Sequence, residues 1–411
     1  MKVQLFAMPT IPATPDERAA LRPIGRNVER YQRMLDELEA LVVCADRAGI
    51  TSFGTTEHHF HTEGGEACPN PLLMYSRFAA RTERIMFVPL SIVLTASNPI
   101  RVAEDVALFD NLFHGRMGVA FARGYQHRWM YVLMQRDDAV AMMGDPDKEV
   151  MNRAIFEEYL DVVLKAWTED AFAHDGEHFA IPYPREGITG WMPTDWTNAY
   201  GAEGELDADG KIVKLGVIPK PFQDPHPPLF VPVVASGASL DNAARKGMVA
   251  FVADSRPDAF AESCRRYQEV ANEHGRDLAL GEGVGGVRQI VIGDSYDEAF
   301  ELAATTNGFH YHHYFEVMGH AEQMRIPADD PNQMVRFADE YACTQRMVDT
   351  EFLLCGTAEQ VVEKLEGQAA CFGDGKLEWL NWLFFMQGTA SIEVQQDQVQ
   401  RFAEKVWPAF K

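Results

Sequence analysis

Short apolar runs alternate with amphipathic segments along most of the chain. Residues 3–8 and 51–56 form β-type runs, and residues 28–48 between them have the hydrophobic period of a helix that ends before Gly49. The alternation continues with predicted helices at 71–80, 99–112, 149–168, 239–246, 257–274, 294–317, 357–370 and 392–408, and with predicted strands at 84–94, 116–122, 229–234, 248–252, 286–292 and 377–385. Eight strands that alternate with helices predict an α/β fold of the (β/α)8 TIM barrel type; an open doubly wound sheet is the alternative, because alternation does not show closure.

Two segments interrupt this alternation. Residues 171–228 are rich in Gly, Pro, Asp and Trp without sustained periodicity, which predicts an insertion after the fourth βα unit. Residues 318–341 are polar, contain proline and precede the last strand, which predicts an active-site lid before strand 8. We therefore expect one barrel domain over residues 1–411 that carries both segments.

Composition narrows the class of protein. A hydrophobic content of 46% in 411 residues is ample for a large core, and a formal net charge of −24 argues against nucleic acid and anionic membranes as partners. The chain has no signal-like N-terminus and no apolar run of membrane-spanning length, so we expect a soluble, cytoplasmic protein. Six scattered cysteines without a C-x-x-C pair favour reduced thiols.

Titratable side chains follow the predicted strand at 51–56 without a gap. They are Glu57, His58, His59 and, two residues on, His61. The carboxyl ends of barrel strands hold catalytic groups, and one histidine here is suited to act as a general base. Because side chains alternate along an extended segment, His58 and His59 should diverge, which disfavours a metal site. A metal site and a purely structural role for these histidines remain alternatives, and we predict no metal.

Two further strand ends have features that suit a phosphate. The strand at 116–122 ends in Arg123-Gly124, where an arginine fork stands beside a glycine that lets the backbone approach a ligand. The alternative for Arg123 is an ion pair with a carboxylate. The strand at 229–234 ends in a small-residue turn whose N–H groups and hydroxyls open a helix, although a simple N-cap has the same sequence. This turn contains Ser236, Gly237, Ala238 and Ser239.

An aromatic and histidine cluster lies late in the chain, at residues 310–315. Helical spacing brings Tyr311, Tyr314 and Phe315 near one face. Core packing and contact with a substrate are equally consistent with this pattern.

Motifs throughout the chain resemble those of the bacterial luciferase family of flavin-dependent monooxygenases. They occur in the family's order and include Glu57-His-His-Phe60, Gly64-Gly65, Asn70-Pro71, residues 92–110, Gly115-Arg116, Ala122-Arg-Gly124, Val233-Val-Ala235, Gly356-Thr-Ala-Glu-Gln360 and residues 402–410. The resemblance implies a barrel that binds reduced FMN (FMNH2) and reacts it with O2 to form a C4a-peroxyflavin.

The resemblance also implies roles for single residues. His58 matches the first family histidine, implicated as a base near the flavin, and His59 matches the second; Glu57 is assigned to the same flavin site. Arg123 matches the arginine that contacts the FMN phosphate, and Leu90-Ser91 matches a non-proline cis peptide beneath the flavin ring. Two positions depart from luciferase itself, because Ala122 stands where luciferase has cysteine and Ser236 stands where it has glutamate. We therefore do not carry light emission over to this chain.

These observations predict a two-component monooxygenase that oxygenates a small organic substrate. A separate NAD(P)H-dependent flavin reductase would supply FMNH2, because the chain has no dinucleotide fingerprint of its own. The resemblance implies a homodimer that pairs through the helices near residues 71–80 and 99–112. The alternatives are a hydride-transfer oxidoreductase of the same superfamily that uses the deazaflavin coenzyme F420, and a non-catalytic flavin-binding protein.

Overall fold

The structure is a computed structural model that describes residues 1–140, 145–233, 237–369 and 378–410. The chain forms two compact units: unit 1 comprises Met1–Ser91 and Leu229–Lys411, and unit 2 comprises Ile92–Pro228. None of the helices in the described ranges combines the length and the apolar composition of a membrane span.

Unit 1 is built on a parallel sheet. Its strands follow the order β3-β2-β1-β12-β10-β9-β8, and β11 pairs with the second half of β10. Their carboxyl ends therefore lie at one edge of the sheet, where parallel α/β folds place their functional groups. The strands are β1 (Lys2–Ala7), β2 (Ser52–Gly54), β3 (Met86–Phe87), β8 (Leu229–Val233), β9 (Val249–Val252), β10 (Val284–Ile292), β11 (Leu353–Gly356) and β12 (Trp379–Phe384); β4 (Leu90–Val93) crosses the boundary between the units.

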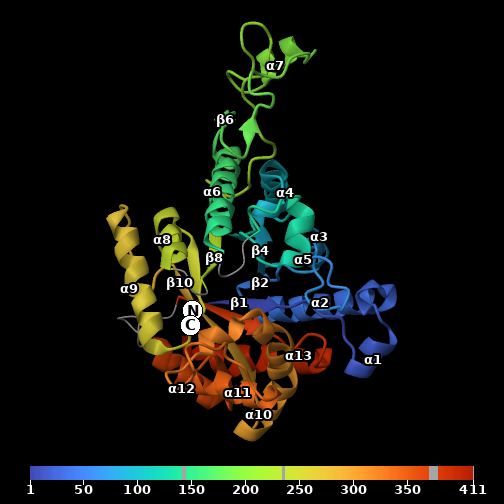
Figure 1. Ribbon diagram of the computed structural model, residues 1–411, viewed down its shortest axis with the longest axis vertical. Coiled ribbons are helices and arrows are strands. Elements are labelled where there is room, and N and C mark those ends of the chain that lie inside the picture. The colour runs from blue at the N-terminus through green and yellow to red at the C-terminus, as the bar shows by residue number, and fades with distance from the viewer. Residues whose placement is uncertain (141–144, 234–236, 370–377, 411) are drawn as a thin grey trace. The chain divides into compact units, whose positions relative to one another are not determined.

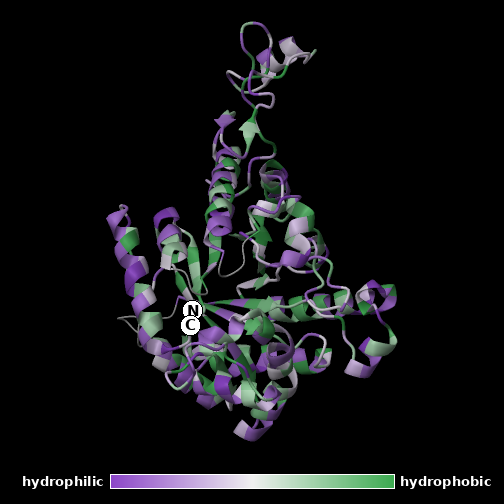
Figure 2. Cartoon of the chain, in the orientation of Figure 1, coloured by the Kyte–Doolittle hydropathy of each residue, from purple (hydrophilic) through white to green (hydrophobic). Residues whose placement is uncertain are grey.

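The longer helices of unit 1 bury one face each. In α2 the buried side includes Leu38, Leu41 and Val42, and in Figure 2 purple and green alternate along α9, as expected for an amphipathic helix. The two ends of the described chain lie side by side, because the Met1 amino group donates to the Phe410 carbonyl at 2.6 Å (Figure 1). The helices are α1 (Pro15–Ala20), α2 (Val28–Ala48), α3 (Pro71–Ala79), α8 (Gly237–Lys246), α9 (Pro257–Glu273), α10 (Tyr296–Ala303), α11 (Glu340–Asp349), α12 (Ala358–Ala369) and α13 (Ile392–Arg401).

Unit 2 packs helices around a short strand. The buried Trp167 on α6 donates its indole N–H to the Ala103 carbonyl of α4 at 3.0 Å and so joins these two helices. In Figure 1 the segment that carries α7 extends beyond the end of α6, and no residue of α7 is buried. The elements are α4 (Pro99–Leu112), β5 (Val119–Ala122), α5 (His127–Met134), α6 (Pro146–Thr168), β6 (His174–Asp175), β7 (Ala180–Ile181) and α7 (Thr194–Tyr200).

Several elements differ from the sequence predictions. The single strand predicted at 84–94 consists of β3 and β4, and the long helix predicted at 294–317 is α10 followed by π-helical turns at Ala304–Gly308 (η3) and Tyr311–Phe315 (η4). The helices α1, α5 and α11 and the strand β11 were not predicted; α1 and β11, with six and four residues, are too short to establish a hydrophobic period.

The two segments that interrupt the alternation contain little regular structure. Residues 171–228 include the antiparallel pair β6-β7, α7 and isolated bridges such as Phe172 with Leu215. Residues 318–341 include one 3-10 turn, His320–Met324 (η6), and reach the start of α11. Their assignment as insertion and lid stays a prediction.

Candidate functional site

The polar segment after β2 begins beside an unusual peptide bond. The Leu90 N–H donates to the Thr55 carbonyl at 2.9 Å, and the peptide bond between Leu90 and Ser91 is cis, as the family resemblance predicts. Gly54 allows this close approach, since a Cβ there would lie 2.3 Å from the Val88 carbonyl oxygen. The Leu90-Ser91 peptide therefore lies next to the residue that follows the carboxyl end of β2.

The loop that follows β2 folds back on itself. The His58 N–H donates to the Cys68 carbonyl at 2.9 Å, and the Ala67 N–H donates to the Pro9 carbonyl at 2.7 Å. Glu66 has a φ of 45°, a left-handed conformation that is uncommon outside glycine and is concentrated at functional sites. This path brings Glu66 next to His58.

His58 and His59 turn toward different carboxylates. His58 Nδ1 lies 3.0 Å from Glu66 Oε1, and His59 Nε2 lies 3.0 Å from Glu57 Oε1. The predicted divergence of the two rings is confirmed. Both members of the first pair are buried, with exposed fractions of 8% for His58 and 2% for Glu66.

Two more polar side chains reach Glu66. The Tyr314 hydroxyl, from η4, donates to Glu66 Oε2 and lies 3.2 Å from His61 Nδ1. His61 Nδ1 lies 3.7 Å from Glu66 Oε2, and its ring stacks on that of His58 with centroids 5.6 Å apart. We call His58, His61, Glu66 and Tyr314 the Glu66 cluster.

The electrostatics of the cluster favour an ionised Glu66. Burial acts to raise the pKa of the carboxyl, but the charge and hydrogen bond of His58, the Tyr314 hydroxyl and the charge of His61 outweigh it and hold the pKa below its ordinary value. Burial lowers the pKa of neighbouring His320, although Glu66 opposes this effect. A buried carboxylate thus lies among polar groups that stabilise its negative charge.

Sequence reasoning identified His58 and Tyr314 but missed Glu66. Glu66 follows Gly64-Gly65 in a polar stretch, which resembles an ordinary solvent-exposed loop. Tyr311, the other predicted pocket residue, is 2% exposed, donates to the His320 carbonyl at 2.9 Å and packs edge-on against Phe352. Contact between Tyr311 and a substrate stays a prediction.

Arg123, in unit 2, has a carboxylate partner. Its Nη1 atom lies 2.5 Å from Glu149 Oε2, and the two side chains are 27% and 37% exposed. The Arg123 carbonyl accepts from Thr95 Oγ1 at 2.7 Å, and Gly124 has a φ of 69°. The ion pair that was the alternative for Arg123 is therefore present. Ala122, the last residue of β5, directly precedes Arg123.

The predicted phosphate turn before α8 is described only in part. Ser236 lies outside the described residues, whereas Gly237 and Ala238 are exposed at the start of α8 and Ser239 is half-buried. The Arg266 guanidinium carbon lies 3.2 Å from the point where a Gly237 Cβ would stand. The Arg266 guanidinium donates to both carboxylate oxygens of Asp241, at 2.6 and 2.8 Å, and the first N–H groups of a helix carry a partial positive charge that suits an anion.

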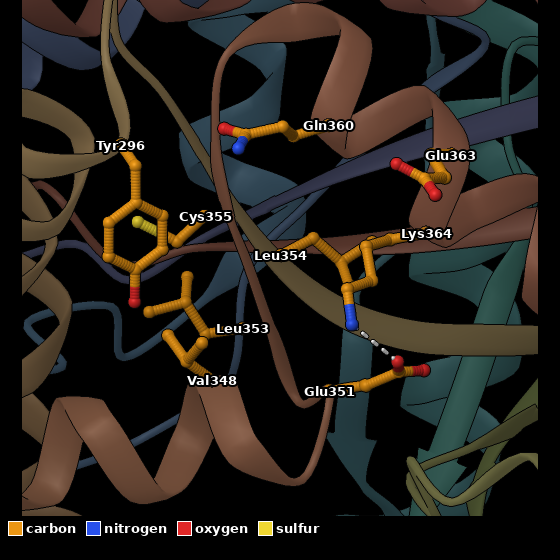
Figure 3. Close-up of a pocket in the computed structure, with 9 residues that line it drawn as sticks. All are labelled: Tyr296, Val348, Glu351, Leu353, Leu354, Cys355, Gln360, Glu363 and Lys364. Atoms are coloured by element: carbon orange, nitrogen blue, oxygen red, sulfur yellow. Dashed lines mark hydrogen bonds and ion pairs between the residues drawn. The ribbon is translucent and has the colours of Figure 1, made fainter.

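A separate pocket of about 180 Å³ lies in another part of unit 1 (Figure 3). Its lining includes Tyr296, Leu354 and Cys355, with the Glu351–Lys364 ion pair at 2.8 Å beside them, and it includes no member of the Glu66 cluster. Burial raises the pKa of the Cys355 thiol to about 12, so this thiol is unreactive near neutral pH. The pocket is smaller than the several hundred Å³ of ordinary cofactor sites.

No group of three or more His, Cys, Asp or Glu side chains in the described ranges is arranged to hold a metal ion. The buried imidazole–carboxylate pair in the loop after a parallel strand is suited to move a proton, as in α/β enzymes.

Residues 1–374 match the model of the luciferase-like monooxygenase family. The chain belongs to this family, so the predicted family and the predicted class, a flavin-dependent monooxygenase, are confirmed.

Two relatives differ in how much of their length they share with the chain. The oxygenase component of a flavin-dependent trigonelline monooxygenase from Acinetobacter baylyi is 21% identical over 397 residues, which are 93% of this chain and 91% of that protein. An uncharacterised protein from Sinorhizobium fredii is 23% identical over 270 residues; the chain spans 65% of its length, just under two thirds.

Solved structures share the fold over the whole chain. The oxygenating constituent of 3,6-diketocamphane monooxygenase from Pseudomonas putida, in complex with FMN, has a TM-score of 0.70 at 18% identity and covers 99% of this chain and 98% of that one. An F420-dependent secondary alcohol dehydrogenase has a TM-score of 0.61 at 14% identity, with 100% and 99% covered. The fold is thus of the α/β barrel-like type of these proteins.

Proposed function

We propose that this chain is the oxygenase of a two-component system, which takes FMNH2 from a separate NAD(P)H-dependent reductase and transfers one oxygen atom of O2 to a small organic substrate. The observation that carries the proposal is the buried His58–Glu66 pair in the loop that follows β2. Family membership supports it, as does the full-length similarity to a protein named as an oxygenase component.

The donor groups of the chain suit a flavin with a phosphate. Arg123 offers a guanidinium that is 27% exposed, and the start of α8, with Gly237, Ala238 and Ser239, offers backbone N–H groups. We propose Arg123 as one phosphate contact and, independently, the start of α8 with Ser236 as another. Glu57, Leu90, Ser91 and Ala122 are assigned to the isoalloxazine part.

Reduced FMN would supply the activation of O2, and the side chains of the chain would orient the reactants and move protons. His58 would accept a proton at Nε2, since its Nδ1 faces Glu66. His59, paired with Glu57, would support the pocket from the neighbouring position. The segment 318–341 would close over the bound substrate and exclude water.

Incubation with photoreduced FMN and ¹⁸O2 tests the proposal. The substrate panel includes trigonelline and diketocamphane, the compounds named for the two similar proteins, and mass spectrometry detects the product. We expect one ¹⁸O atom in the product. An anaerobic titration should show tighter binding of reduced than of oxidised FMN, because a reductase must deliver the reduced form and the oxidised form must leave after turnover.

A second candidate is hydride transfer with coenzyme F420, which the similarity to an F420-dependent dehydrogenase favours. Preferential binding of F420 and turnover without O2 consumption would establish this candidate instead. Flavin binding without any product or O2 consumption across the panel would indicate a binding protein.

A further inference from the structure

We infer that Glu66 is the positioning carboxylate of His58, and that Tyr314 fixes the orientation of Glu66. The inference deepens the proposed function and rests on it, because it assumes that His58 is the base. Glu66 lies six residues after the Glu57-His-His-Phe60 motif, and it comes into contact with His58 because the loop folds back.

The first step concerns the tautomer of His58. Glu66 Oε1 lies 3.0 Å from Nδ1; the contact lacks hydrogen-bond alignment, but an ionised carboxylate this close favours a proton on the nitrogen that faces it. The neutral ring therefore carries its proton on Nδ1, which makes Nε2 the basic nitrogen. When Nε2 takes up a proton, Glu66 stabilises the imidazolium without becoming protonated, as the aspartate of a serine-protease triad does.

The second step concerns the other carboxylate oxygen. Glu66 Oε2 accepts from the Tyr314 hydroxyl and faces His61 Nδ1 at 3.7 Å, and His320 contributes to the field at the same carboxylate. Glu66 is 2% exposed, so these groups replace the water that would otherwise solvate the anion. Tyr314 thus fixes Oε2, which sets the direction in which Oε1 faces the His58 ring.

The third step links the base to the segment 318–341. Tyr314 lies on η4, and Glu316, two residues on, accepts from His312 Nδ1 at 2.8 Å and receives the Phe337 N–H at 3.4 Å. The Arg336 guanidinium donates to the Glu316 carbonyl. The chain segment that carries Tyr314 is therefore connected, through Glu316, to residues of the proposed lid.

Glu66→Gln gives the sharpest test. The Tyr314 hydroxyl donates to Oε2, so the amide oxygen should take that position and the NH2 group should face His58 Nδ1. An NH2 donor forces the proton to Nε2, and the base is lost although the fold and the volume are kept. We expect kcat for oxygenation to fall by roughly 10²–10⁴-fold with little change in KM or FMN affinity.

The tautomer of His58 can be measured without any flavin, by ¹⁵N NMR of protein labelled with ¹⁵N-histidine. The protonated ring nitrogen of His58 should be Nδ1 in the wild type and Nε2 in Glu66→Gln. The His58→Asn variant identifies which signals belong to His58. Glu158→Gln is the matched control, because Glu158 pairs with His174 at 3.2 Å in unit 2. We expect wild-type turnover for this control.

The outcomes are distinct. A folded Glu66→Gln with an unchanged tautomer, or with a changed tautomer and wild-type kcat, overturns the inference. If Glu66→Gln does not fold, Tyr314→Phe decides: a several-fold lower kcat with the Nδ1 proton retained supports the inference, and an unchanged kcat overturns it. If the wild type incorporates no ¹⁸O, the proposed function fails, whereas the ring-nitrogen signals still test the positioning.

Discussion

Replacing Arg123 with alanine tests the phosphate contact against the ion pair. The guanidinium lies 2.5 Å from Glu149 Oε2, and the two side chains are 27% and 37% exposed. An ion pair this accessible contributes about 0–1 kcal/mol to stability, so Arg123→Ala should change the melting temperature little. FMN binding should change far more, because the flavin phosphate would lose its charged donor.

The magnitude follows from the type of contact. A hydrogen bond to a charged group is worth about 1.5–3 kcal/mol, which corresponds to a roughly ten- to hundredfold weaker Kd for FMN. Riboflavin lacks the phosphate and should bind Arg123→Ala as it binds the wild type. Glu149→Gln removes the competing anion, so FMN should bind up to about fivefold more tightly, from about 1 kcal/mol.

Anaerobic titrations of reduced FMN and reduced riboflavin against each variant measure these differences. Arg136→Ala is the matched control, because Arg136 pairs with Asp138 at 2.5 and 2.6 Å in the same unit. Equal weakening of FMN and riboflavin by Arg123→Ala, or unchanged FMN affinity, would assign Arg123 to the ion pair alone and refute the phosphate contact.

Three further predictions concern His58, the dimer and pH. His58→Ala should cut product formation by roughly 10²–10⁴-fold while flavin oxidation continues and releases hydrogen peroxide; a stable variant with normal coupling between flavin oxidation and product would remove His58 from the mechanism. The protein should sediment as a homodimer at micromolar concentration, and Leu73→Glu on α3, where Leu73 is 74% exposed, should yield the 46.1 kDa monomer; a wild type that is already monomeric contradicts this. Burial lowers the pKa of His310 from 6.5 to about 4 despite its hydrogen bond to the Gln387 carbonyl, so between these pH values the unfolded chain binds more protons than the folded chain. The free energy of unfolding should therefore fall on acidification from pH 6.5 to 4, by up to about 3 kcal/mol. Melting curves of His310→Gln should lack this pH dependence.

Local signals were sufficient to predict individual helices. The helix predicted at 28–48 has the same bounds as α2, because Asn27 caps its first turn and Gly49, with a φ of 85°, ends it. The helix predicted at 99–112 likewise matches α4, where Asn98 is the N-cap and proline is the first residue. The polar segment at 57–59 was found for the same reason, since it directly follows a β-type run.

The partners of that segment could not be predicted from local pattern. Glu66 reaches His58 through a left-handed backbone at a non-glycine residue, which no hydrophobic period encodes. Tyr314 is 248 residues away from Glu66 in sequence, and the π-helical turns that orient it have no recognised sequence signal. Arg123 was found, but its pairing with Glu149 depends on how β5 and α6 pack.

The two π-helical turns determine which kinds of change the chain can tolerate between α10 and Glu316. A π turn holds one residue more than an α turn, so deleting a single residue within Ala304–Gly308 would convert the turn to α-helix and leave later side chains pointing in nearly the same direction. A deletion in a purely α-helical segment would instead rotate every later side chain by about 100°. Among related chains, a gap of one residue at this position would therefore be compatible with a retained Tyr314–Glu66 contact.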